Sequence, residues 1–360
     1  MPTLSLAMIV KDEAVTLGRI LGDAAAFCDE LVVVDTGSTD GTVEIALAAG
    51  AKVEHFAWVD DFAAARNASF AACSSDWIVW LDADDRITPE VQQRLSSYKQ
   101  SLLSDDLDAV YVPYRYHYTD DGQTCTLELP RERLLRRAAG LRWDGAVHEV
   151  IAVPDGTRTA APPGVWVEHR PDAEVRATRG GRNLRILEGV VSGGDRSPRT
   201  MLYLGNELAS NGRHEEAVAA WSEFVDSVPH GWERTEGLLA MARSMRELGR
   251  RQDCEATLHR ILRADASRAE TWVLLGLLHY DAQEWSQAVP YFLGATGCTM
   301  PAEGFVMRAD YEYVPWDYLS VCWHNLGDQK RALEALGRSV EGNPDRERLI
   351  DNAGWIVRKW

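Results

Sequence analysis

The chain has 360 residues, which at about 100–200 residues per domain allows two or three domains. Apolar residues make up 46% and charged residues 26%, which excludes disordered, collagen-like and small disulfide-bonded proteins. The formal net charge of −17 argues against a general nucleic-acid-binding protein, because such a protein needs a basic face. It leaves room for a local basic pocket that holds one nucleotide.

Residues 1–110 alternate between strand and helix patterns. Strands are predicted over 4–10, 31–35, 52–55 and 77–81, and helices over 14–27, 42–49 and 61–73. This alternation predicts an α/β domain with a mostly parallel, Rossmann-like sheet and helices on both faces. Residues 110–170 are richer in β-forming residues and predict antiparallel or irregular strands that complete the same domain.

From about Thr178 the pattern is that of a helical repeat. One repeat position is held by Gly205, Ala242, Gly276 and Ser320. Twelve residues later stand the small residues Ala217, Cys254, Ala288 and Ala332, and sixteen later the large Trp221, Leu258, Phe292 and Leu336. This is the tetratricopeptide pattern of paired antiparallel helices, although a plain helical bundle would share part of it.

The predicted domains are an α/β domain over 1–175 and an all-α repeat solenoid over 178–360. We expect a capping helix over 345–360 and an insertion near 303–313 between the last two repeats. The sequence has no apolar run of the ~18 residues that a spanning helix needs, and the apolar start is too short for a signal peptide. The scattered cysteines suit a reducing compartment, so the expected location is the cytoplasm, without a membrane partner.

A turn rich in Gly, Ser, Thr and Asp follows the strand that is predicted to end at Asp35. Open α/β sheets bind ligands at the carboxyl ends of their strands, so Asp35, Ser38 and Asp40 suit contacts with a nucleotide base or ribose. Asp35 stands directly at the end of a buried strand, and we favour a binding role for it. Asp40 could equally serve only as a helix cap.

Three carboxylates, those of Asp82, Asp84 and Asp85, follow the predicted strand at 77–81. Such close like charges raise one another's pKa unless a cation neutralises them, and a hard divalent cation with oxygen ligands is the natural partner. That cation could hold a diphosphate and take up charge as a phosphate group leaves. The alternative is a solvated acidic loop that leads into the next helix.

Four segments in order resemble the family 2 glycosyltransferases: residues 11–13, 32–42, 58–69 and 80–85. The resemblance covers residues 3 to about 170. It implies a nucleotide-sugar-binding domain of the GT-A type and an inverting hexosyltransferase that uses a nucleotide sugar, usually UDP-linked, with Mn²⁺ or Mg²⁺. It assigns the base or ribose contact to Asp35, and the DxD motif to Asp82, Ala83 and Asp84, with Asp84 as the preferred direct metal ligand.

The resemblance also implies donor-binding roles for Lys11 and Glu13, and it places Arg66 near the diphosphate. A structural ion pair of Arg66 with neighbouring aspartates is an alternative. In the basic segment 131–137, Arg133 or Arg136 could meet the diphosphate, although solvated charges are an equal reading.

Direct displacement at the anomeric carbon needs a general base. Bacterial family 2 enzymes that carry repeats show a similar G-x-x-H-E segment, so we predict Glu149 as the base and His148 as a metal or diphosphate contact. Asp144 is the reserve base. His169 could be a second metal or diphosphate contact, but we favour a surface histidine.

The sequence shows no GxGxxG, Walker A or QxxRW-like pattern, which argues against dinucleotide chemistry, NTP hydrolysis and processive synthesis. The layout is similar to bacteriocin peptide S- and O-glycosyltransferases. The leading hypothesis is transfer to Ser, Thr or Cys of a peptide or protein acceptor that the repeats hold. The alternatives are a saccharide or small-molecule acceptor with the repeats forming a homodimer, and an inactive transferase domain that serves as a binding scaffold.

Overall fold

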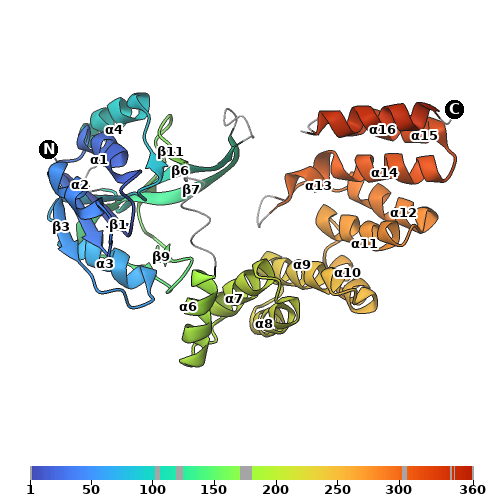
Figure 1. The fold of residues 1–360 in the computed structure, drawn as a ribbon, viewed down its shortest axis with the longest axis horizontal. Coiled ribbons are helices and arrows are strands. Elements are labelled where there is room, and N and C mark those ends of the chain that lie inside the picture. Colours follow the sequence, from blue (N-terminus) through green and yellow to red (C-terminus); the bar gives the residue numbers. More distant parts are fainter. Residues whose placement is uncertain are drawn as a thin grey trace. The chain divides into compact units, whose positions relative to one another are not determined.

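The computed structural model describes residues 2–101, 106–118, 125–170, 181–301, 306–340, 343 and 345–358 (Figure 1). The chain forms two compact units, Met1–Val190 and Val191–Trp360. This division falls inside helix α6 (Arg182–Ser192), whereas we predicted a boundary between 175 and 178. The start of α6 belongs to the first unit because Arg185 pairs with Asp60 there, with nitrogen–oxygen distances of 2.6 and 2.8 Å.

The first unit is built on a nine-stranded mixed sheet. Its parallel half consists of β3 (Lys52–His55), β2 (Glu30–Asp35), β1 (Leu4–Val10) and β4 (Trp77–Trp80), in that spatial order. The other half consists of β7 (Cys125–Arg136), β6 (Ala109–Tyr118), β11 (Val167–His169) and β5 (Asp85–Arg86), with β10 (Thr159–Ala160) beside β6. A separate ribbon pairs β8 (Trp143–Asp144) with β9 (Val150–Ile151). The predicted α/β class is confirmed.

Both faces of the parallel strands are buried. Leu6 and Met8 of β1 enter one core, while Ala7 between them enters the other. The first core also receives side chains from α1 (Leu17–Ala25), α2 (Thr42–Ala48) and α4 (Pro89–Ser101), and the second from α3 (Phe62–Ala72). Each large apolar side chain buried in this way contributes about 1.5–3 kcal/mol. This burial on two faces explains the continuous apolar runs.

The second unit is a series of antiparallel helix pairs, which confirms the predicted tetratricopeptide solenoid. The pairs are α7 (Pro198–Ser210) with α8 (His214–Ser227), α9 (Trp232–Glu247) with α10 (Arg251–Ala264), α11 (Ala269–Asp281) with α12 (Trp285–Thr296), and α14 (Val314–Asn325) with α15 (Gln329–Ser339). Helix α13 (Arg308–Glu312) lies in the insertion predicted near 303–313, of which residues 303–305 are outside the described residues. Helix α16 (Arg346–Arg358) follows as the predicted final helix.

The small residues of the repeat are required by close helix packing. A Cβ atom at Gly205 would overlap the ring of Trp221, and one at Gly276 would stand 2.6 Å from Cε1 of Phe292. Both pairs join the predicted repeat position to the one sixteen residues later. The repeat therefore depends on a small residue that receives a large one.

Gly276→Ala is expected to lower the free energy of unfolding of the second unit by about 1–3 kcal/mol, because the new methyl group must displace Phe292. The matched control is Gly337→Ala in α15, where the added Cβ meets nothing within 4 Å. There alanine should stabilise the helix by about 0.5–1 kcal/mol. Urea unfolding of the full chain, followed by circular dichroism, measures both changes. Equal effects of the two substitutions would contradict this packing.

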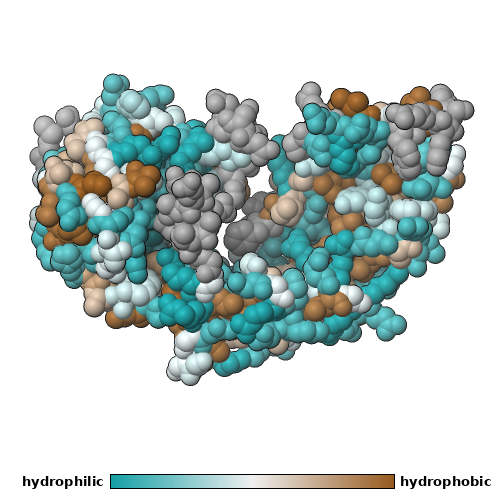
Figure 2. All heavy atoms as spheres, viewed as in Figure 1, coloured by the Kyte–Doolittle hydropathy of each residue, from teal (hydrophilic) through white to brown (hydrophobic). Residues whose placement is uncertain are grey.

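Exposed apolar side chains are scattered among hydrophilic ones on the face shown in Figure 2. Val15, Leu47 and Val59 are among the most exposed of the first unit. Isolated apolar residues of this kind are normal on soluble proteins. Within the described residues, no helix combines the length and apolar character needed to cross a bilayer.

Candidate active site

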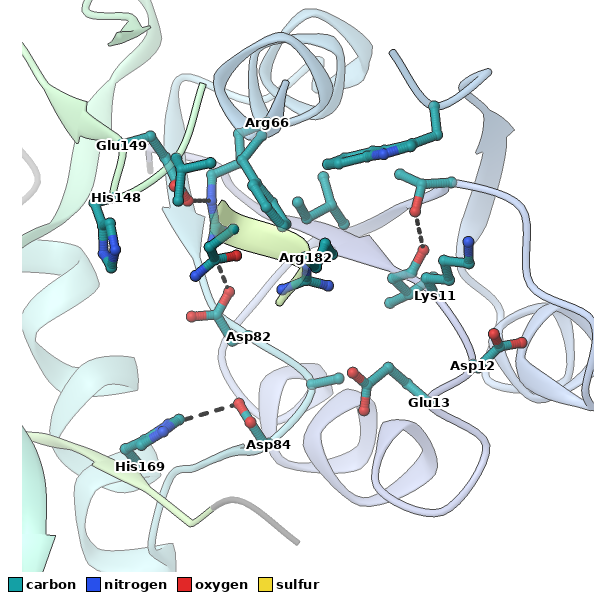
Figure 3. Close-up of a pocket in the computed structure, with 18 of the residues that line it drawn as sticks. Lys11, Asp12, Glu13, Arg66, Asp82, Asp84, His148, Glu149, His169 and Arg182 are labelled. Atoms are coloured by element: carbon teal, nitrogen blue, oxygen red, sulfur yellow. Dashed lines mark hydrogen bonds and ion pairs between the residues drawn. The ribbon is translucent and has the colours of Figure 1, made fainter. Parts of the chain in front are cut away.

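A cavity of about 530 Å³ opens at the carboxyl ends of β1 and β4 (Figure 3). Lys11 and Glu13 follow β1, and residues 82–84 follow β4. The other wall residues come from β1, β6, β11, α3, α6 and the loop between β8 and β9, together with Thr36 directly after β2 and Trp58 shortly before α3. Most of the predicted donor-binding and catalytic residues thus meet at one edge of the sheet, where open α/β sheets bind ligands.

Arg66 joins two carboxylates on one side of the cavity. Its Nη2 donates to Asp82 Oδ1 at 2.8 Å and its Nε donates to Glu149 Oε1 at 2.6 Å. The guanidinium carbon also lies 5.2 Å from the ring centre of Trp80 and 4.8 Å from that of Trp143. Burial alone would raise the pKa of Asp82, but Arg66 holds it below its usual value. Arg66 is therefore ion-paired, but with Asp82 and Glu149 from distant parts of the sequence and not with the neighbouring aspartates that we considered.

Asp84, the second aspartate of the DxD motif, faces His169. The distance between Asp84 Oδ1 and His169 Nδ1 is 3.6 Å. Burial and the negative charge of Asp82 raise the pKa of Asp84 to about 6. Burial disfavours the charged form of His169, but its acidic neighbours raise its pKa overall. Together with Asp85 these residues could bring three ligand atoms within 4.8 Å of one another. His169 is thus part of the cavity wall and not a simple surface residue.

Asp85 is held by the protein itself. Its Oδ1 accepts from the hydroxyl of Tyr114 at 2.8 Å, and its Oδ2 accepts from the backbone N–H of Asp82 at 2.9 Å and from Arg133 at 3.2 Å. The same Tyr114 hydroxyl lies 2.9 Å from His169 Nδ1. Asp85 therefore fixes the loop that carries Asp82 and Asp84, and Tyr114 links that loop to His169.

Arg133→Met is expected to lower the free energy of unfolding of the first unit by about 3–5 kcal/mol, because it leaves the buried Asp85 charge unpaired. Both side chains of this pair are fully buried. The control is Arg94→Gln, which breaks an exposed pair with Glu90 on α4 and should change stability by less than about 1 kcal/mol. Urea unfolding of the full chain tests both. If both variants change the free energy of unfolding by a similarly small amount, groups other than Arg133 must stabilise the buried charge of Asp85.

Backbone strain is concentrated beside the cavity. Among the described residues, four that are not glycine have a φ in the left-handed region: Asp12, Asp60, His148 and Gln283. Two of them, Asp12 and His148, line the cavity. Non-glycine residues in this conformation cost of order 1 kcal/mol each and often mark functional sites. The strain at His148 sets the direction of the chain just before Glu149.

The turn after β2 satisfies its own polar groups. Burial alone would raise the pKa of Asp35, but hydrogen bonds from Ser38 and Gly37 lower it overall. The carboxylate of Asp40 accepts from the backbone N–H of Thr42 at 3.0 Å and from that of Ala14 at 3.2 Å. Asp35, Ser38 and Asp40 are not among the cavity-lining residues of the described chain. Their contact with a base or ribose stays a prediction, and Asp40 supports the start of α2.

Three other predicted residues do not line the cavity. Arg136, near the end of β7, pairs with Asp108, and Arg133 is buried against Asp85. Asp144 is exposed on β8 and does not line the cavity, whereas His148 and Glu149 do. The geometry therefore offers no support for a diphosphate contact of Arg136.

Several wall residues lie at positions for which the sequence predicts no role. Trp58 and Phe62 pack edge to face, with ring centres 4.8 Å apart, and Arg182 lies over Phe62 at 4.7 Å. Tyr116 stacks on His169 at 4.9 Å. Trp58 and Phe62 stand within the motif at 58–69, so that motif could have indicated them. Arg182 stands thirteen residues after the end of the last strand, β11, and no sequence motif predicts a role for it.

A protein-family model described as Glycosyl transferase family 2 matches residues 5–159. The TPR repeat-containing protein Synpcc7942_0270 of Synechococcus elongatus is 40% identical over 151 residues, which are 42% of this chain and 36% of that protein. The SPbeta prophage-derived glycosyltransferase SunS of Bacillus subtilis is 25% identical over 226 residues, which are 60% of this chain and 52% of that protein.

Among solved structures, the TPR protein YrrB aligns at 12% identity and a TM-score of 0.37, over 50% of this chain and 86% of its own. The present chain spans about half or less of the length of the two curated relatives.

Proposed function

We propose, on the premise that residues 5–159 form a family 2 glycosyltransferase domain, that this protein transfers a sugar from a nucleotide donor to a peptide acceptor. The observation that carries the proposal is the cavity at the carboxyl ends of β1 and β4, where Asp82, Asp84, Arg66 and Glu149 meet. The proposed reaction inverts the anomeric carbon and uses a nucleoside diphosphate, UDP in the first instance, as the leaving group.

In this proposal Glu149 is the general base. Its Oε1 accepts from Arg66, which orients the carboxylate, and its side chain is only 12% exposed. A carboxylate held in this way can take the proton of an acceptor hydroxyl or thiol while its oxygen or sulfur attacks the sugar. Arg66 also donates to Asp82, so its guanidinium would position both Glu149 and the loop that follows β4.

The residues present fit a divalent cation. Burial and the charge of Asp82 raise the pKa of Asp84 to about 6, a cost to the charged form that a bound cation would offset, and His169 adds a nitrogen ligand beside it. An oxygen and nitrogen donor set suits Mn²⁺ and also accepts Mg²⁺. Asp84 and His169 would hold the ion, with Asp82 beside them, while Asp85 fixes the loop. Such an ion would neutralise the charge of the departing diphosphate.

The second unit supplies the reason for a peptide acceptor. Tetratricopeptide solenoids stack helix pairs into an extended surface, and such surfaces commonly hold peptides in extended form. Ser, Thr and Cys side chains offer the oxygen or sulfur nucleophile that the reaction needs. We therefore propose that the repeats hold the acceptor polypeptide.

Calorimetry with UDP, GDP, CDP and dTDP, each with Mn²⁺ or with EDTA, tests the donor half of the proposal. We expect one diphosphate to bind and Mn²⁺ to strengthen its binding. A folded sample that binds none of the four contradicts a transferase and favours the binding scaffold.

The acceptor half is tested by incubating the full chain with the matching nucleotide sugar and a library of Ser-, Thr- and Cys-containing peptides. Mass spectrometry should then show peptides that gain the mass of one sugar. Transfer only to added saccharides would favour the alternative acceptor.

A further inference from the structure

The strands β8 and β9 form a two-stranded ribbon apart from the nine-stranded sheet. The loop between them brings His148 and Glu149 to the cavity wall. In the part of the chain that the structure describes, pairing with the large sheet therefore does not fix this ribbon. The position of Glu149 has to come from other contacts.

Asn67 of helix α3 pairs with the backbone of β8. Its Nδ2 donates to the carbonyl oxygen of Trp143 at 2.9 Å, and its Oδ1 accepts from the N–H of the same residue at 3.0 Å. An amide side chain is suited to this task because it carries a donor and an acceptor side by side. The two bonds resemble the exchange between paired residues of neighbouring strands. Asn67 thus fixes the strand from which the loop departs.

Two other residues of α3 hold the rest of the loop. The N–H groups in the first turn of a helix have no partner inside the helix. That of Phe62, the first residue of α3, donates to the carbonyl oxygen of Ala146 at 2.9 Å. Arg66 donates to Glu149 at 2.6 Å (Figure 3). The contacts fall on residues 143, 146 and 149, so one helix holds the loop at its start, middle and end.

The loop needs such anchors because its backbone is strained. It turns at Gly145, where φ is 95°, and at His148, where φ is 54°. A residue other than glycine keeps this conformation only where the surrounding structure fixes it. The contacts of Asn67 at the start of the loop and of Arg66 at its end supply that constraint. Loss of either anchor allows His148 to relax and Glu149 to move.

We propose that Asn67 is a positioning residue for the general base Glu149, and that it acts by holding β8 at Trp143. The proposal rests on the proposed function, in which Glu149 takes the proton of the acceptor. Asn67 is not among the residues that line the cavity, so it does not touch the nucleotide donor there. Its loss should therefore slow the chemical step and leave donor binding unchanged.

The first test observes the loop directly and needs no ligand. Hydrogen exchange of the full chain, read by mass spectrometry, compares the unmodified chain with Asn67→Ala. Peptides that cover residues 143–151 should exchange at least about 10-fold faster in the variant, while those over β4 should keep their rate. Asn67→Asp keeps the shape of the side chain but sets a carboxylate against the carbonyl of Trp143. It should show the same pattern, and it replaces Asn67→Ala if that variant does not fold.

The second test measures turnover with the nucleotide sugar and an accepted peptide, and diphosphate affinity by calorimetry. Asn67→Ala should lower turnover at least about 10-fold, because a small misplacement of a catalytic group is costly, and keep the affinity within about 2-fold. In a chain that already carries Glu149→Gln, it should lower turnover further by less than about 2-fold, because both changes act through the same base.

The matched control is Gln92→Ala. Gln92 is an amide side chain of α4 that donates to the carbonyl oxygen of Ile87 at 2.8 Å, and it lies outside the cavity lining. Its removal costs a similar hydrogen bond in the same unit. It should change neither turnover nor the exchange of residues 143–151.

The outcomes separate this proposal from the one it rests on. If the unmodified chain binds no diphosphate and transfers no sugar, the proposed function itself fails, and the role of Asn67 fails with it. If the unmodified chain is active and Asn67→Ala is equally active, only the role of Asn67 is overturned. Unchanged exchange of residues 143–151 in Asn67→Ala would also overturn it. So would an equally large further loss in the Glu149→Gln chain, because Asn67 would then act independently of the base.

Discussion

Asp84→Asn is expected to remove the effect of Mn²⁺ on nucleoside diphosphate binding and to slow sugar transfer at least about 100-fold. Asparagine has nearly the same shape as aspartate but no charge, so it weakens a cation site without leaving a hole. The carboxylate of Asp84 faces His169 and stands beside Asp82 and Asp85. The substitution should also relieve repulsion among these carboxylates, so the free energy of unfolding should stay the same or rise.

The measurement compares diphosphate affinity in Mn²⁺ and in EDTA for the unmodified chain and the variant. The variant should bind equally in both, at the level of the unmodified chain in EDTA. Asp155→Asn removes an exposed carboxylate from the same unit, away from the cavity, and should keep the full Mn²⁺ effect. A variant of Asp84 that still responds to Mn²⁺ would remove Asp84 from the metal site.

The parts of the site that could be predicted from the sequence are those that follow strand ends. Asp82 and Asp84 come directly after a buried apolar strand, and the edge at which such strands end follows from the parallel sheet. The small residues of the repeat could be predicted for a similar reason, because their spacing repeats along the chain. In each case the information is local or periodic.

The parts that could not be predicted depend on pairing between distant strands. His169 reaches the acidic loop because β11 pairs with β5, in a register that sets His169 opposite Asp85. Arg133 lies in the basic segment 131–137, whose sequence is equally compatible with solvent-exposed charges and with a diphosphate contact. The antiparallel pairing of β7 with β4 instead places its guanidinium 3.6 Å from the ring centre of Trp80, next to Asp85. The register of such strand pairs depends on the packing of the whole sheet. The sequence therefore left the roles of His169 and Arg133 open.

Glu149→Gln is expected to lower the turnover of sugar transfer by about 10²–10⁴-fold and to leave the affinity for the nucleoside diphosphate within about 2-fold. Glutamine can still accept the hydrogen bond from Arg66 Nε through its amide oxygen, so the wall of the cavity should keep its shape. It cannot take a proton from the acceptor. The expected loss is therefore confined to the chemical step.

The matched control is Asp144→Asn, the same loss of charge at the other candidate base, which should leave turnover unchanged because Asp144 lies outside the cavity lining. Turnover is followed as release of nucleoside diphosphate from the nucleotide sugar with an accepted peptide, and affinity by calorimetry. A large loss in Asp144→Asn with full activity in Glu149→Gln would assign the base to Asp144. Loss of diphosphate affinity in Glu149→Gln would instead mean that Glu149 serves to hold Arg66 in place, because the carboxylate and that guanidinium support each other.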